Sequence, residues 1–121
     1  MEVIAFVSTT DPARARAFYA ETLGLELESE SPFAVVLRSG GTMLRVTVVE
    51  QLTPQPFTVL GWSVPDIAAT IEKLSARGVA FERFDGMDQD ELGVWTSPAG
   101  GRIAWFKDPD GNVLSLTQFT A

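Results

Sequence analysis

The chain has 121 residues, of which 45% are hydrophobic and 21% charged, and it contains no cysteine. This composition indicates one ordinary globular domain with a sizeable core, and it excludes disulfides, thiolate metal sites and cysteine nucleophiles. The net charge of −7 repels phosphate backbones, and no apolar run approaches the ~18 residues that span a bilayer, so we expect neither a nucleic-acid nor a membrane partner. The N-terminal MEVIAFVSTT lacks the basic region of a secretory signal, and a cytoplasmic location is therefore expected.

The first half of the chain predicts a strand, a helix and three further strands. Residues 3–9 (VIAFVST) are apolar and strand-like, and Asp11 then caps a helix over 12–23. Pro12 suits the first helical position, and Gly24 can end the helix with a positive φ. Three more strands are predicted, near residues 25–29, 33–39 and 42–49.

The second half repeats this order. A strand over 57–64 is followed by Asp66, a helix over 67–77 and Gly78. Further strands are predicted near residues 79–83, 93–97 with 102–107, and 112–119. The fold class is therefore α+β, a single domain over 1–121 made of two βαβββ modules, with module 1 over 1–50, a linker over 51–56 and module 2 over 57–121. Each helix covers one sheet face, and the two free faces are expected to curl together into a cleft.

Two motifs carry a resemblance to a known family. The first is Asp11 with AFYAETLGLEL (17–27), and the second is the hairpin WFKDPDGNVLSL (105–116). With the repeated modules, they make the chain resemble, over essentially its whole length, the vicinal oxygen chelate superfamily of glyoxalases, bleomycin resistance proteins and extradiol dioxygenases. The resemblance implies a glyoxalase-like mixed-sheet cleft, in which the enzymes of the family hold a divalent metal.

The resemblance places the usual metal-ligand positions at Ile4, Arg45, Val59 and Ser115. The chain contains no histidine, and among these four side chains only the serine hydroxyl offers an oxygen, which is a poor ligand. We therefore expect no bound metal, no cofactor and no catalytic residues of the family type.

Strand alternation, with the metal-ligand positions taken as facing inward, predicts the residues that line the cleft. The ligand-binding candidates are Phe6, Ser8, Arg45, Val59, Ser63, Trp105 and Ser115. Trp105 leads, because an indole packs well on planar or cationic ligands, although it could equally fill space that a metal and substrate leave. Trp62 has the opposite parity and should lie in the core, whereas the face of Trp95 stays open.

The charge of the ligand also stays open. Arg45 favours a carboxylate or phosphate, whereas the acidic segment 83–92 (RFDGMDQDEL) favours a cation, if it is more than a solvated loop.

The leading expectation is a metal-independent protein that binds a small organic molecule, planar or cationic by preference. Its most concrete form is sequestration of an antibiotic or toxin, as in bleomycin resistance, by a homodimer. The alternative is a divalent-metal-dependent lyase, isomerase or dioxygenase of the glyoxalase type. Two further readings are a metal-independent enzyme using Tyr19, a carboxylate or a hydroxyl, and a regulatory module with a vestigial cleft.

Overall fold

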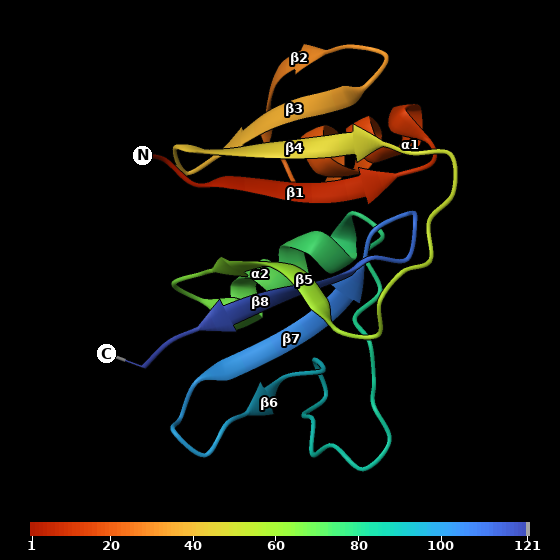
Figure 1. The fold of residues 1–121 in the computed structure, drawn as a ribbon. Coiled ribbons are helices and arrows are strands. Elements are labelled where there is room, and N and C mark those ends of the chain that lie inside the picture. Colours follow the sequence, from red (N-terminus) through yellow and green to blue (C-terminus); the bar gives the residue numbers. More distant parts are fainter. Residues whose placement is uncertain (121) are drawn as a thin grey trace. The chain divides into compact units, whose positions relative to one another are not determined.

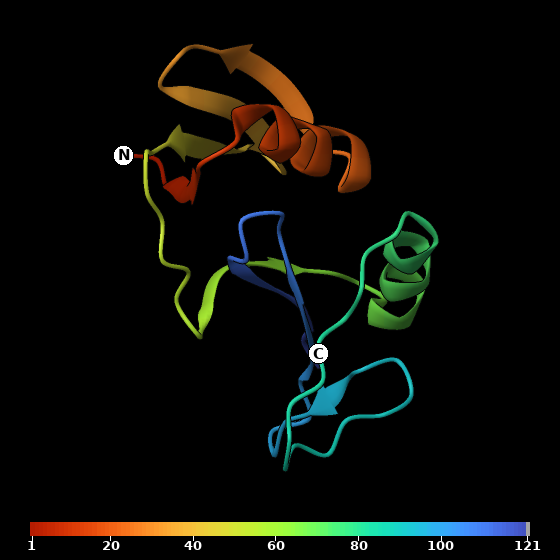
Figure 2. The same cartoon turned by 90° about the vertical axis from the view of Figure 1, so that its right-hand side faces the viewer.

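The computed structural model describes residues 1–120, and the chain forms two compact units. Unit 1 consists of Met1–Gln55 together with Asp108–Asn112, and unit 2 consists of Pro56–Lys107 and the residues from Val113 onward. Each unit contains a four-stranded sheet with helix on one face only (Figures 1 and 2). No helix within residues 1–120 is long and apolar enough to cross a membrane.

Unit 1 has the strand order β1-β4-β3-β2, in which β1 runs parallel to β4 and the other pairs are antiparallel. Its elements are β1 (Ile4–Thr9), α1 (Pro12–Arg16), η1 (Ala17–Thr22), β2 (Glu26–Glu30), β3 (Ala34–Ser39) and β4 (Thr42–Val48). The predicted helix over 12–23 is present, and the Asp11 carboxylate caps it by accepting from the Arg14 amide at 3.2 Å. Its second half is a π-helix, marked by the bond from the Leu23 amide to the Phe18 carbonyl, which the spacing of apolar residues did not indicate.

Unit 2 repeats the order as β5-β8-β7-β6, with β5 parallel to β8. Its elements are β5 (Thr58–Ser63), α2 (Ile67–Ala76), β6 (Trp95–Thr96), β7 (Arg102–Lys107) and β8 (Val113–Gln118). The predicted fold class, α+β with two βαβββ modules and mixed sheets, is confirmed.

One predicted strand is wrong. Residues 79–83 form only a single bridge, between Phe81 and Phe106, and a bond from the Glu82 amide to the Trp105 carbonyl at 2.8 Å. The Phe81 ring packs against Phe106 with 5.4 Å between ring centroids, and the chain then leaves β7 in a long loop. The two-residue β6 takes the place in the sheet that β2 holds in unit 1.

The core of each unit lies on the sheet face that carries the helix. Four strand residues predicted to pack under the helices, Leu44, Val46, Leu114 and Leu116, are buried. In β3 and β8 the residues between such positions are buried as well, so burial there does not alternate. Trp62 shares this face, where its ring stacks on Phe106 at 6.4 Å and 23°. The predicted face of Trp62 is therefore confirmed, although the side chain is half-buried rather than part of the buried core. The opposite face of each sheet is free of helix (Figure 2).

The turn between β7 and β8 is fixed in unit 1 by the buried Asp108 carboxylate. It accepts four hydrogen bonds: from the Tyr19 hydroxyl at 2.7 Å, the Asn112 side chain at 2.8 Å, the Asn112 amide at 2.9 Å and the Asp110 amide at 3.0 Å. Asn112 also donates to the Ser8 carbonyl at 2.9 Å. Both sequence motifs therefore meet in one network, because Tyr19 belongs to the first and Asp108 to the second.

A second carboxylate in the turn holds the end of β1. Asp110 accepts bonds from the amide and the hydroxyl of Thr10, both at 2.9 Å, and from the Thr9 hydroxyl. Thr9 is fully buried and bonds in addition to the Asp11 backbone that begins α1. The DPDG sequence thus has a structural role beyond forming a turn, because its carboxylates satisfy donors of unit 1.

Tyr19 should make the stability of the folded chain depend on pH in the alkaline range. Burial, and then the adjacent negative charge of Asp108, raise the pKa of the Tyr19 phenol above its usual value. The unfolded chain releases the phenol proton from about pH 10, whereas the folded chain retains it, so the free energy of unfolding should fall as the pH rises above that point. Because Tyr19 is the single tyrosine, tyrosinate absorbance reports on it alone.

Tyr19→Phe should cost about 1–3 kcal/mol at neutral pH, since Asp108 loses a buried donor. The variant should also lose less stability than the wild type on going to alkaline pH. Urea unfolding at a series of pH values tests both statements. Equal pH dependence in the two proteins would contradict the assigned role of Tyr19.

Candidate functional site

The helix-free face of unit 2 presents Trp105 beside Ser115 and Gly61. Trp105 on β7 pairs with Ser115 on β8, which pairs with Gly61 on β5, so the three positions lie in one row across the sheet. The Trp105 indole N–H donates to the hydroxyl oxygen of Thr58 on β5 at 3.1 Å. Because β8 lies between β7 and β5, the indole extends across β8, which accounts for the burial of Val113 and Ser115 on this otherwise open face.

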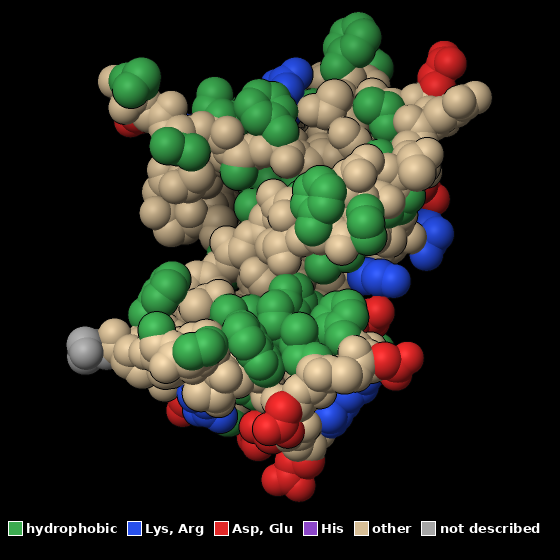
Figure 3. Space-filling model, turned by 60° about the horizontal axis from the view of Figure 1, so that its bottom comes forward, with side chains coloured by type: hydrophobic (Ala, Val, Ile, Leu, Met, Phe, Trp, Pro, Cys, Tyr) green, Lys and Arg blue, Asp and Glu red, His purple; other side chains and the backbone are tan. Residues whose placement is uncertain are grey.

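Two further aromatic rings flank Trp105. Phe84 meets it edge-on, with 5.5 Å between centroids and 88° between planes, and Trp95 lies 6.3 Å away at 38°. Trp95 pairs with Ile103, two residues from Trp105, so it occupies this same face. We call Phe84, Trp95 and Trp105 the aromatic patch. Hydrophobic side chains gather on the surface of unit 2, with charged side chains at their border (Figure 3).

A long loop, residues 82–94, positions Phe84. The Gln89 side chain accepts from the Phe84 amide at 2.8 Å and donates to the carbonyls of Glu82 at 3.0 Å and Gly93 at 2.8 Å. Gln89 also bridges to Trp95 through the backbone. One amide group therefore ties together the segments that carry both neighbours of Trp105.

The charges of this loop are only partly available to a ligand. The Arg83 guanidinium donates to the carbonyls of Asp90 and Glu91, both at 2.6 Å, and the Asp90 carboxylate accepts from the amides of Leu92 and Val94, both at 2.9 Å. These bonds lie within the loop, and Asp90 also forms an ion pair with Arg102 of β7 at 3.9 Å. Asp85 and Asp88 are exposed and form no ion pair within residues 1–120, so they remain as negative charge on the surface.

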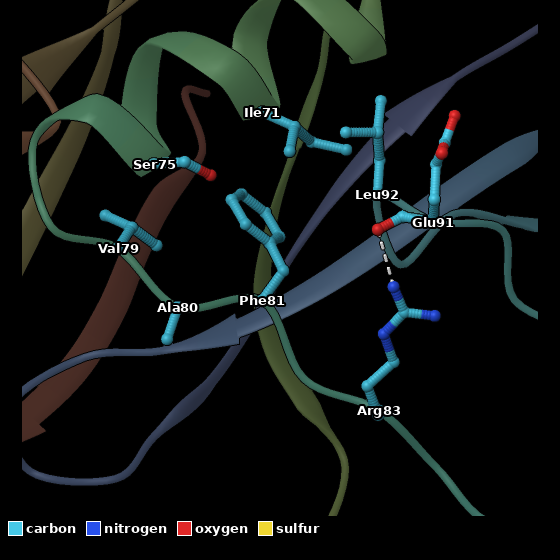
Figure 4. A pocket seen from close by; sticks show the side chains of 8 residues that line it. All are labelled: Ile71, Ser75, Val79, Ala80, Phe81, Arg83, Glu91 and Leu92. Carbon is cyan, nitrogen blue, oxygen red and sulfur yellow. Dashed lines mark hydrogen bonds between the residues drawn. The ribbon is translucent and has the colours of Figure 1, made fainter.

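The loop also forms a hollow against α2, on the helix side of unit 2 (Figure 4). Its volume is about 270 Å³. It is lined by Ile71, Ser75, Val79, Ala80, Phe81, Arg83, Glu91 and Leu92. Arg83 is engaged there with the backbone carbonyls of Asp90 and Glu91, so its charge serves the loop rather than a ligand in the hollow (Figure 4).

The other predicted candidates fall into two groups. Val59 and Ser63 are exposed on β5 of unit 2, with Val59 at a bulge in the pairing with β8. Phe6, Ser8 and Arg45 lie on the helix-free face of unit 1, where Phe6 is 59% exposed and directly opposite Arg45. Arg45 is half-buried and, among the described residues, its guanidinium makes neither an ion pair nor a hydrogen bond.

The residues present do not fit a metal centre of the family type. Ile4 and Val59 carry no donor atom, Arg45 is cationic, and Ser115 offers one hydroxyl. Within residues 1–120, no three Asp, Glu, His or Cys side chains lie close enough together to hold a metal ion.

The comparison with known families agrees with the fold. The model of the Glyoxalase/Bleomycin resistance protein/Dioxygenase superfamily matches residues 3–116. The chain therefore belongs to this superfamily. No curated protein matches the chain significantly.

Solved structures of the superfamily superpose over nearly the whole chain. A bleomycin resistance determinant encoded on the transposon Tn5 has a TM-score of 0.78 at 22% identity, covering 100% of this chain and 99% of that one. TnmS3, an antibiotic binding protein from Streptomyces sp. CB03234, has a TM-score of 0.71 at 26% identity over 99% and 98%. A lactoylglutathione lyase from Agrobacterium tumefaciens has a TM-score of 0.72 at 18% identity over 96% and 92%, which shows a shared fold.

Gln89→Glu should disturb the aromatic patch. The change removes the side-chain amide that donates to the carbonyls of Glu82 and Gly93 and places a carboxylate next to those carbonyls. This should lower the free energy of unfolding by about 1–3 kcal/mol. Indole rings 6.3 Å apart couple electronically, so the coupled circular-dichroism band of Trp95 and Trp105 should weaken. Gln51→Glu, an exposed position in the linker, makes the same charge change as a control. A coupled band equal in both variants would show that Gln89 does not position the patch.

Proposed function

We propose that this chain is a metal-independent small-molecule-binding protein whose ligand packs against Trp105. The observation that carries the proposal is the aromatic patch, in which Phe84 and Trp95 flank a half-buried indole on a sheet face free of helix. Such a surface offers flat apolar area with few polar groups, as small-molecule sites do. Ser115, Val59 and Ser63 are proposed as further contacts on the same sheet.

The proposed biological form is stoichiometric sequestration of an antibiotic or toxin. Its support is the 26% identity to an antibiotic binding protein over nearly the whole chain. Binding alone suffices for such a role, so no base, nucleophile or metal is required of the chain. The surface charge of Asp85 and Asp88 favours a cationic ligand over an anionic one at this patch.

Unit 1 has a second candidate binding surface, which differs from the aromatic patch in carrying a positive charge. Phe6 and Arg45 place an exposed ring beside a half-buried, unpaired guanidinium, and Ser8 lies further along β1. A guanidinium of this kind binds carboxylate or phosphate oxygens in a forked arrangement. We propose these three residues as contacts for a carboxylate or phosphate group at the surface of unit 1.

A homodimer is proposed as the functional state, because the exposed apolar side chains of β1 are best covered by another protein surface. Ile4 is 47% and Phe6 59% exposed. Light scattering during gel filtration at micromolar concentration should report twice the mass of 13.1 kDa. Phe6→Asp should shift the protein towards the monomer. A monomeric wild type at that concentration would refute the dimer.

The binding proposal is tested by calorimetric titration with 9-aminoacridine, a planar cation, and 2-naphthoate, a planar anion, in the presence of a chelator. Trp105→Ala should weaken binding of the preferred probe by roughly 5- to 30-fold, the value of a lost aromatic contact with its buried area. Trp62→Phe alters an indole on the core face and should leave the affinity within about twofold, a change smaller than one hydrogen bond.

Binding that appears only after a divalent metal is added would overturn the proposal and favour a metal-dependent enzyme. Equal affinity in the wild type and Trp105→Ala would place the ligand elsewhere on the chain. Circular dichroism of each variant checks that the fold is retained.

A further inference from the structure

The side-chain hydroxyl of Ser115 has no hydrogen-bond partner among the described residues. The residue is only 7% exposed, yet among residues 1–120 its side chain makes no hydrogen bond. Among the described residues no side-chain nitrogen or oxygen atom is both buried and unbonded, so the unbonded Ser115 Oγ is reached by solvent although most of its residue is covered. Its donor and its acceptor positions are both available to a ligand.

The absence of a side chain at Gly61 leaves space next to this hydroxyl. Gly61 pairs with Ser115 across the sheet and is itself exposed. A Cβ atom at Gly61 would lie 2.6 Å from the Ser115 Oγ, far inside the contact distance. The hydroxyl therefore occupies the space over Gly61 that any other side chain would fill, at the border of the area that the Trp105 indole covers.

We propose that Ser115 Oγ hydrogen-bonds to an oxygen on the edge of the ligand, which makes the ligand class a flat aromatic molecule with a hydroxyl or carbonyl group. The ligand's apolar part contacts the aromatic patch, and its polar edge reaches over Gly61. Gly61 is then a positioning residue, because it leaves the hydroxyl in place and the approach free. This inference rests on the proposed function and adds the chemical group that the site selects.

The test uses two probes of equal shape, 2-naphthol and 2-methylnaphthalene, measured by equilibrium dialysis with a chelator present. Ser115→Ala should weaken 2-naphthol binding by roughly 3- to 10-fold, the value of one hydrogen bond. Binding of 2-methylnaphthalene should stay within about twofold, because the methyl group makes no hydrogen bond. Ser29→Ala, an exposed serine of β2 with no side-chain bond, is the matched control and should change neither.

A second measurement tests the geometry without any ligand. Gly61→Ala should lower the melting temperature in the wild-type background, because the new methyl group collides with Ser115 Oγ. The same change should cost less in the Ser115→Ala background, where the nearest remaining side-chain atom is the Cβ at 3.9 Å. Equal losses in both backgrounds would show that the hydroxyl does not lie over Gly61, and would overturn the inference.

The outcomes separate this inference from the function on which it rests. If Ser115→Ala affects both probes equally, or neither, the hydroxyl does not select an oxygen, while binding at Trp105 stands. If neither probe binds the wild type, the proposed function fails for flat aromatic ligands, and the selection fails with it. Loss confined to 2-naphthol supports both.

Discussion

The buried carboxylate of Asp108 is the constraint on which the arrangement of this chain depends. A buried charge is costly unless hydrogen bonds replace its water, and Asp108 has four, one of them from the only tyrosine. The bonds join a turn late in the sequence to the π-helix and to β1 of unit 1. They fix the residues at which β7 ends and β8 begins, and hence the strand register that puts Ser115 opposite Trp105. The family motif is thus explained by folding rather than by chemistry.

The candidate ligand-binding residues lie on the sheet faces that no helix covers. In unit 2 the Trp105 indole crosses β8 towards Thr58, which pairs with Val113, so it does fill space on this face. It also presents an aromatic surface that Phe84 and Trp95 extend. The two interpretations of Trp105 from the sequence are therefore compatible: the ring fills space beside Ser115 and forms the floor of the aromatic patch.

Much of this could be predicted from local sequence signals. Capping aspartates, terminal glycines and strand alternation located both modules and assigned Trp62 to the core and Trp105 to the open face, because each signal acts within a few residues. The acidic segment 83–92 was predicted as a loop, but the contacts of its side chains could not be predicted in this way. Trp95 lies beside Trp105 because it pairs with Ile103 on β7. Phe84 is held there by the bonds of Gln89, which join residues whose spacing follows no regular period. The π-helix was also missed; it contains Tyr19, whose hydroxyl bonds to a carboxylate 89 residues away, a contact that no local pattern indicates.

The central claim is that an organic ligand binds at Trp105 without a metal. The three tryptophans give three indole N–H signals in proton–nitrogen NMR spectra, two from the aromatic patch and one, Trp62, from the core face. Titration with 2-naphthol in the presence of a chelator tests the claim most directly. The account predicts shifts at the Trp95 and Trp105 signals and none at Trp62. Unchanged spectra, or shifts that require added divalent metal, would contradict it.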